Sequence, residues 1–208
     1  RSITAGTRVV MKIGILALQG DFNKHSFILE KLDLEPTFVR YPSDLNRISG
    51  LIIPGGESTT MTKLMDRAGF YESITSFANR NPVLGTCAGL IMMSTQAKDK
   101  RIKTLGLLDV DVERNASGRQ IHSICVPLDI DIVGKSQTMD ATFIRAPKIV
   151  RCGPNVNVLA TFNGLPCALQ SGRHLGLSFH PELNGVSIFH EFAFKNSVAL
   201  KEKRIHAA

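Results

Sequence analysis

The 208-residue sequence has no long apolar run. No stretch approaches the ~18–20 uninterrupted apolar residues that a membrane-spanning helix needs, so we expect no membrane partner. The first ten residues also lack the apolar core of a secretion signal. We interpret residues 1–10 as a leader or a cloning remnant, because the first strand-like run begins directly after Met11.

Cysteine is scarce, and its spacing argues against two structural roles. The four cysteines form no C-x-x-C pair, so we expect no metal site, and nothing else in the sequence indicates a cofactor. A chain of this size does not need disulfides, and reduced thiols fit the cytoplasm. We interpret three of the four as small buried hydrophobic residues: Cys125, Cys152 and Cys167.

The net charge of +7 does not follow the pattern of a nucleic-acid-binding protein. Arg1 and Arg8 supply two charges and the basic tail at residues 201–208 a net two, which leaves +3 for residues 11–200. Those residues contain no stripe of Lys and Arg interleaved with aromatic side chains. We therefore expect no nucleic-acid partner.

No repeat, low-complexity tract or Pro/Gly/Ser-rich linker divides the chain, so residues 11–200 are expected to form one domain. In the first half, apolar runs of strand length alternate with helical stretches. We expect strands at 12–18, 36–41, 50–56 and 82–86, and helices at 20–34, 58–70 and 88–97. This alternation predicts a mostly parallel sheet with helices on both faces.

Two helices show finer signals. Phe22, Phe27, Ile28 and Leu32 mark an apolar stripe that we expect to be buried. For the next helix, either Ser58 or Thr59 is a plausible N-cap.

The second half is richer in strand-like runs, and "NGLP" at residues 163–166 is typical of a hairpin connection. A final helix is expected at 185–200. The fold class that follows is α/β, with three layers and antiparallel additions to a mostly parallel sheet.

Cys87 stands at a junction where functional sites form, between an apolar strand and a helix. Gly85 and Gly89 flank it in a G-x-C-x-G pattern, the cysteine counterpart of the nucleophile elbow. A helix amino terminus favours the thiolate form of such a cysteine. From this stretch alone, a buried core thiol and a nucleophile are equally good interpretations.

Two further clusters favour the nucleophile. "FHPE" follows an apolar strand and supplies His180 as a base and Glu182 as the group that orients it. "PGGES" ends another strand, and its adjacent glycines let backbone N–H groups approach a developing oxyanion. A capping histidine, a solvated glutamate and an ordinary turn are the alternatives for these residues taken singly.

Taken together, "LGTCAGL", "PGGES" and "FHPEL" resemble the triad-type (class I) glutamine amidotransferases. More narrowly, the chain is similar to the glutaminase subunits of pyridoxal 5′-phosphate synthase. The motifs that carry the narrower resemblance are "LALQGD" (16–21) with His25, "IIPGGESTTM" (52–61), "VERNASGRQ" (112–120), "FIRAP" (143–147) and "FHPEL" (179–183). The resemblance implies a flavodoxin-like fold and hydrolysis of L-glutamine.

The resemblance also implies roles for individual residues. Cys87 would be the nucleophile, His180 the base and Glu182 its orienter. The substrate would be bound by a group on three loops: Gly55, Gly56, Glu57, Ser58, Arg114, Ile144 and Arg145. The fork of an arginine suits the α-carboxylate of glutamine.

The implied partner is a (β/α)8-barrel synthase subunit that receives the ammonia. In the family the glutaminase is poorly active until it docks, which would require a rearrangement at residues 54–56. His25 and the "LQGD" turn are candidates for the docking surface. Ser117, His122 and Lys24 depart from the family pattern, and the alternatives are a glutaminase serving another synthase or a non-enzymatic relative.

Overall fold

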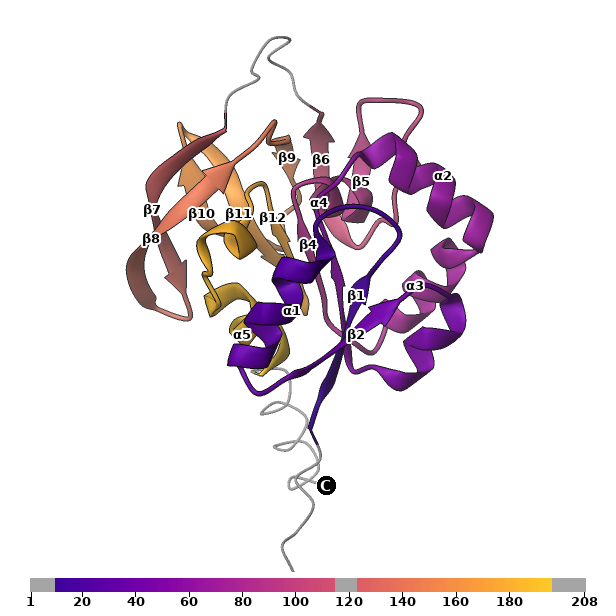
Figure 1. Cartoon of the computed structure of the whole chain (residues 1–208). Coiled ribbons are helices and arrows are strands. Elements are labelled where there is room, and N and C mark those ends of the chain that lie inside the picture. Colours follow the sequence, from indigo (N-terminus) through magenta and orange to yellow (C-terminus); the bar gives the residue numbers. More distant parts are fainter. Residues whose placement is uncertain (1–9, 115–122, 196–208) are drawn as a thin grey trace, which may run out of the picture.

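The computed structural model describes residues 10–114 and 123–195 (Figure 1). The expected basic tail, and all of the expected leader except Val10, lie outside these residues. So do two of the departures from the family pattern, Ser117 and His122.

A seven-stranded sheet forms the centre of the molecule. Its strand order is β10 (Val156–Phe162), β11 (Leu165–Ser171), β12 (His174–Leu177), β4 (Val83–Thr86), β3 (Gly50–Ile53), β1 (Lys12–Leu16) and β2 (Glu35–Val39). Strands β12 to β2 are parallel, and β10 and β11 add to them antiparallel. The expected parallel core and antiparallel additions are therefore confirmed.

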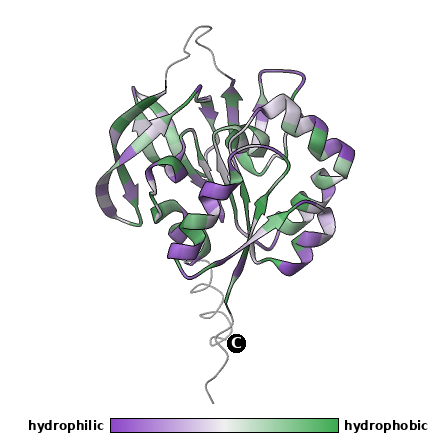
Figure 2. Cartoon of the chain, viewed as in Figure 1, coloured by the Kyte–Doolittle hydropathy of each residue, from purple (hydrophilic) through white to green (hydrophobic). Residues whose placement is uncertain are grey.

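The central strands are buried on both faces because their side chains alternate between two apolar layers. In β3, Leu51 and Ile53 belong to one core cluster and Ile52 to the other. Strand β4 divides in the same way, with Val83 in the first cluster and Leu84 in the second. Figure 2 shows this as hydrophobic central strands enclosed by helices whose outer faces are hydrophilic.

Different elements cover the two faces. The first cluster packs under α2 (Ser58–Ala68), α3 (Phe70–Ala78), α4 (Ala88–Met93) and a small sheet of β5 (Ser94–Ala97), β6 (Leu108–Glu113) and β9 (Lys148–Cys152). The second packs under α1 (Phe22–Lys31), α5 (Ile188–Phe194) and the hairpin of β7 (Ile124–Ile132) and β8 (Lys135–Phe143). The 3-10 helices η1 (Pro42–Arg47) and η2 (Pro181–Asn184) complete the described elements. The result is the expected three-layer arrangement (Figure 1).

The expected hairpin at residues 163–166 is confirmed. Asn163 and Gly164 have φ values of 50° and 74° between the antiparallel strands β10 and β11. Two consecutive positive φ values are the signature of a tight hairpin turn, which Asn-Gly adopts with little strain.

Several details of the expected helices are wrong. Phe27 is 62% exposed, so it does not belong to the buried stripe of α1. The N-cap of α2 is Glu57, whose carboxylate accepts hydrogen bonds from the backbone N–H groups of Thr59 and Thr60. A carboxylate offers two acceptor oxygens to the orphan N–H groups, which a hydroxyl does not.

The other two differences concern helix length. Helix α4 ends at Met93, because residues 94–97 pair with β6 as strand β5. The final helix begins at Ile188 rather than at residue 185, because Gly185 closes the preceding 3-10 helix in a left-handed conformation (φ 65°). Its expected extension over residues 196–200 lies outside the described residues.

Among the described residues, no helix combines the length and the apolar character needed to cross a membrane.

Candidate active site

Cys87 occupies a strained turn between β4 and α4. Its backbone has φ 49° and ψ −107°, a conformation that few non-glycine residues adopt and that is concentrated at functional sites. The Cys87 N–H donates to the Leu177 carbonyl of β12 at 2.8 Å, which holds the turn against the sheet. A side chain at Gly89 would overlap the Ile53 carbonyl, so the expected small-residue elbow has a steric cause.

His180 and Glu182 form a hydrogen-bonded pair beside this turn. His180 Nδ1 lies 2.7 Å from Glu182 Oε1, and since a carboxylate only accepts, Nδ1 is the donor. Glu182 is buried in η2 with 2% of its side chain exposed, whereas His180 keeps 14%. Phe179, directly before the pair, is fully buried and packs edge-to-face against Phe189 of α5, which anchors the segment.

The protonation of His180 depends on its two partners. Burial alone would lower its pKa, but hydrogen bonds to Cys87 and Glu182 and the negative charge of both outweigh it and raise the pKa to about 10. Because Glu182 occupies Nδ1, Nε2 is the ring nitrogen left for Cys87. The arrangement places a protonated imidazole next to the sulfur of the candidate nucleophile.

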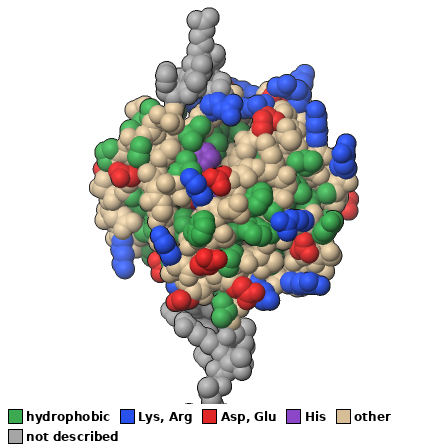
Figure 3. Space-filling view, in the orientation of Figure 1, with side chains coloured by type: hydrophobic (Ala, Val, Ile, Leu, Met, Phe, Trp, Pro, Cys, Tyr) green, Lys and Arg blue, Asp and Glu red, His purple; other side chains and the backbone are tan. Residues whose placement is uncertain are grey.

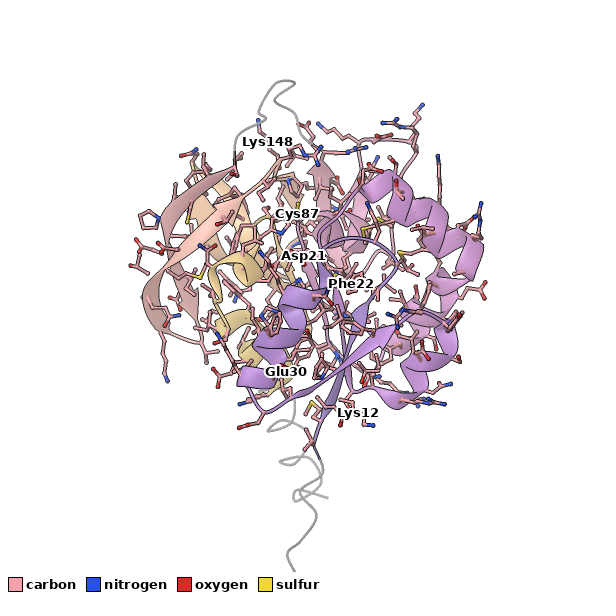
Figure 4. The ribbon with its side chains drawn as sticks, in the orientation of Figure 1. Lys12, Asp21, Phe22, Glu30, Cys87 and Lys148 are labelled. Carbon is pink, nitrogen blue, oxygen red and sulfur yellow. The ribbon has the colours of Figure 1, made fainter. Side chains whose placement is uncertain are left out.

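A cavity of about 340 Å³ opens in front of Cys87, a volume suited to a small metabolite. All ten residues predicted from the sequence line it: Cys87, His180, Glu182, Gly55, Gly56, Glu57, Ser58, Arg114, Ile144 and Arg145. Figure 4 places Cys87 at the upper end of the sheet, close to Asp21 and the start of α1. On the same face in Figure 3, a histidine is visible in a hollow among hydrophobic side chains, with basic and acidic side chains beside it.

The polar wall of the cavity is an ion-paired group. Arg114 Nη2 lies 2.6 Å from Glu57 Oε1, and its other terminal nitrogen lies 3.6 Å from Asp99. Burial would raise the pKa of Glu57, but hydrogen bonds from Thr59 and Thr60 lower it to about 2, so Glu57 is ionised. Arg114 thus presents a fixed positive charge to the cavity, and Glu57 holds it there.

Three further residues shape the cavity. The Ile144 carbonyl lies 3.7 Å from Cys87 Sγ, and Arg145 follows it in a left-handed conformation (φ 44°). Ser58 is 2% exposed, and its hydroxyl has no hydrogen-bond partner among the described residues. A buried hydroxyl without a partner is costly, so its place in the cavity wall suits a polar ligand.

Sequence reasoning assigned no role in the site to Gln19. Its side-chain oxygen accepts the Glu57 N–H at 2.9 Å, which fixes the Gly-rich turn against the first loop of the sheet. The quoted "LALQGD" motif contained this residue without indicating a role. Gly20, Asp21, Ala88 and Ile91 also line the cavity.

The expectation that His25 belongs to a docking surface is wrong. His25 is fully buried on the inner side of α1, where its ring contacts His190 of α5. The neighbouring "LQGD" turn, in contrast, reaches the cavity through Gln19, Gly20 and Asp21. No group of three or more metal-ligating side chains occurs within residues 10–114 and 123–195.

This combination of fold and elbow belongs to a known class of enzymes. A solved structure described as a glutamine amidotransferase matches the chain with a TM-score of 0.82 at 37% identity, over 89% of this chain and 98% of that one. The structure of PurLQS from Thermotoga maritima matches with a TM-score of 0.66 at 16% identity, over 88% of this chain and 97% of that one, which supports the fold alone. The protein is thus a glutamine amidotransferase.

Sequence comparison narrows the class. A model of the SNO glutamine amidotransferase family matches residues 15–199, and the chain belongs to this family. It is 45% identical to the pyridoxal 5′-phosphate synthase subunit PdxT of Oenococcus oeni over 187 residues, which cover 90% of this chain and 97% of the relative. The PdxT subunit of Thermotoga maritima is 42% identical over 183 residues, or 88% of this chain and 97% of the relative.

Proposed function

We propose that this chain hydrolyses L-glutamine to L-glutamate and ammonia, and that it supplies the ammonia to a synthase subunit that makes pyridoxal 5′-phosphate. The observation that carries the proposal is the hydrogen-bonded His180–Glu182 pair beside Cys87 in a cavity of metabolite size. Membership of the SNO family and the names of the PdxT relatives supply the reaction and its destination.

The residues act in a two-stage acyl transfer. The Cys87 thiolate attacks the carboxamide carbon, and the carbonyl oxygen takes up negative charge. Backbone N–H groups at Gly56 and Ala88 are the donors for this oxyanion, because both residues line the cavity beside the nucleophile. His180 then donates its proton to the leaving nitrogen, so that ammonia departs and a thioester remains on Cys87.

Water completes the cycle. Neutral His180 removes a proton from a water molecule, which attacks the thioester and releases glutamate and the Cys87 thiolate. Glu182 keeps the His180 ring in one orientation and stabilises its protonated form through both stages. No resident metal or cofactor takes part in these steps.

Substrate binding is assigned to the cavity wall. Arg114 and Arg145 offer positive charge to the α-carboxylate of glutamine, and Ser58 and the backbone of Gly55 and Gly56 offer hydrogen bonds. Glu57 is ionised and held beside Arg114, which suits contact with the α-ammonium group. Ile144 closes the cavity next to the sulfur.

The partner in this proposal is a (β/α)8-barrel synthase subunit, and the compartment is the cytoplasm, where a catalytic thiol stays reduced. The family match over residues 15–199 supports treating residues 11–200 as a single glutaminase domain.

The test is to incubate the chain with glutamine, alone and with a barrel synthase and its sugar phosphates, and to measure glutamate and pyridoxal 5′-phosphate. We expect glutamate release to rise strongly with the synthase and product to form. Cys87→Ala should abolish both. Cys125→Ala should change neither, because Cys125 is exposed, and the expectation that it is a buried hydrophobic residue is wrong. Glutamate release without product would indicate a glutaminase for another synthase, and no release in the complex would contradict the proposal.

A further inference from the structure

Behind the triad, away from the cavity, lies a pair of buried histidines that no step above uses. His25 comes from α1 and His190 from α5, and both are fully buried. His25 Nδ1 lies 2.9 Å from His190 Nε2, and the ring centroids are 5.2 Å apart. On its other side, His25 Nε2 lies 3.7 Å from Glu182 Oε2 and 3.5 Å from the Thr86 hydroxyl.

Glu182 has one satisfied oxygen and one that is not. Oε1 accepts a hydrogen bond from His180 Nδ1–H at 2.7 Å. Oε2 is buried and has no hydrogen bond among the described residues, so the His25 nitrogen that faces it is its polar neighbour. A buried carboxylate oxygen needs a donor to hold one orientation, and a carboxylate that rotates would release His180.

The tautomers follow from these contacts. Burial, followed by the positive charges that His190 and His180 can carry, holds the pKa of His25 well below its ordinary value, and burial lowers that of His190 to about 3. Both rings are therefore neutral, with one N–H each. A proton on His25 Nδ1 would turn the Nε2 lone pair toward the carboxylate, which is repulsive.

The other tautomer avoids this repulsion and turns an N–H group toward the carboxylate oxygen. His190 Nε2–H donates to His25 Nδ1, and His25 Nε2–H points at Glu182 Oε2 and the Thr86 hydroxyl. At the far end of the pair, His190 Nδ1 has no hydrogen-bond partner among the described residues. As an acceptor it costs less to leave unpaired than an N–H group would.

We propose that His25 is a positioning residue for the triad: held in one tautomer by His190, it directs Nε2–H at the Glu182 oxygen that His180 does not use. It thereby fixes the carboxylate that orients His180, and through His180 it holds the base against Cys87. The chain of contacts from His190 through His25 and Glu182 to His180 joins α5, α1 and η2 beside the end of β4. The packing of α1 and α5 on one face of the sheet therefore sets the geometry of the reacting groups. This role rests on the proposed glutaminase function.

The experiment compares two substitutions of His25 in the complex with the barrel synthase, with glutamate release as the readout. His25→Leu removes the donor and keeps an apolar side chain in the core, whereas His25→Gln keeps an N–H donor. We expect His25→Leu to lower kcat about 10- to 100-fold while KM for glutamine changes less than about 2-fold, because the reacting groups and not the binding wall are displaced. His25→Gln should recover most of the loss.

His174→Gln is the matched control, because His174 is also a largely buried histidine whose pKa is lowered by burial, to about 4, but it contacts the Val83 backbone instead of the triad. It should leave kcat within about 2-fold of wild type. An unchanged kcat in His25→Leu, or an equal loss in His25→Leu and His25→Gln at equal thermal stability, would overturn the inference.

A fourth variant covers the case in which His25→Leu does not fold. His190→Leu removes the group that sets the His25 tautomer and leaves His25 in place, so kcat should fall about 3- to 10-fold at constant KM, and an unaltered kcat would overturn the inference. An inactive wild-type complex would instead contradict the proposed function, so the two failures are distinguishable.

Discussion

The triad has an open side and a closed side, and the pKa values of the buried histidines on the two sides are shifted in opposite directions. On the open side, His180 lines the cavity, and its anionic partners raise its pKa to about 10. On the closed side, His190 has a neutral histidine as its neighbour, and burial lowers its pKa to about 3. Glu182 lies between them and contacts both sides, through Oε1 to His180 and through Oε2 to His25.

The difference shows that burial alone does not decide the charge of a histidine. His180 and His190 both lose hydration, but only His180 gains partners that favour its charged form. The open side can therefore move protons during the reaction, whereas the closed side holds its protons fixed.

The largest effect on kcat is expected from removing the negative charge of Glu182, which contacts histidines on both sides of the triad. Glu182→Gln keeps the shape of the side chain but replaces the carboxylate with an amide, which can turn an N–H toward His180 and does not stabilise an imidazolium. We expect kcat to fall about 10³- to 10⁴-fold, the scale of an orienting carboxylate in a triad, as measured by glutamate release in the complex. Glu191→Gln, at an exposed glutamate of α5, should be neutral, and a loss below about 10-fold in Glu182→Gln would argue against the assigned role.

A side chain on the cavity wall should disturb the open side alone. At Gly55, a Cβ would lie 2.5 Å from His180 Cε1 and 3.4 Å from Cys87 Cβ, so the base must move. We expect Gly55→Ala to lower kcat/KM about 100-fold, because a displacement of this size misaligns the base and the nucleophile. At Gly56 the nearest atom to a new Cβ is Gln19 Oε1 at 3.0 Å, so a shift of a few tenths of an ångström relieves the contact while the hydrogen bond from Glu57 N–H is kept, and Gly56→Ala should cost clearly less. Equal losses would mean that the turn as a whole matters and not its contact with His180.

The open side was predictable from the sequence, and the closed side was not. Cys87 and its glycines form one local pattern, and "FHPE" brings His180 and Glu182 within two residues of each other. His25 and His190 are separated by 165 positions and show no shared local pattern. Only the packing of α1 and α5 on the same face of the sheet brings them together, so the sequence alone carried no signal for the pair.

The N-cap of α2 illustrates the same limit at short range. "GESTT" offers a glutamate and three hydroxyl residues at the start of the helix, and local preference favours the hydroxyls. The structure uses Glu57 because Gln19, from the loop after β1, holds the Glu57 N–H and sets its extended backbone (φ −102°, ψ 112°). The strand and helix order depends on local apolar patterns and was therefore accessible, whereas this cap depends on a contact between two loops.

The pH dependence of stability should have opposite slopes for the histidines on the open and closed sides of the triad. The pKa of folded His180 is raised from 6.5 to about 10, so above pH 6.5 the unfolded state loses this proton first, and the stabilisation falls as pH rises toward 10. The pKa of folded His190 is lowered from 6.5 to about 3, so acidification from pH 6.5 toward 3 protonates the unfolded state and favours it. Each slope has an upper limit of about 1.4 kcal/mol per pH unit.

The measurement is urea unfolding across pH for the wild type, His180→Gln and His190→Leu. The difference in the free energy of unfolding between wild type and His180→Gln should vary with pH only above about pH 6.5. The difference between wild type and His190→Leu should vary only below about pH 6.5. If both differences changed in the same pH range, the assignment of opposite pKa shifts to His180 and His190 would be wrong.

The smallest effect is expected on the outer face of the helix that carries His25. Lys24 precedes His25 in α1 but points away from the core, with 47% of its side chain exposed and a 3.9 Å contact to Asp21. Exposed ion pairs of this kind contribute little, so Lys24→Ala should change the free energy of unfolding by less than about 0.5 kcal/mol and leave kcat within about 2-fold. Thermal unfolding and glutamate release in the complex measure the two quantities. A kcat loss comparable with that expected for His25→Leu would show that the whole of α1 affects the triad, which would contradict a specific positioning role for His25.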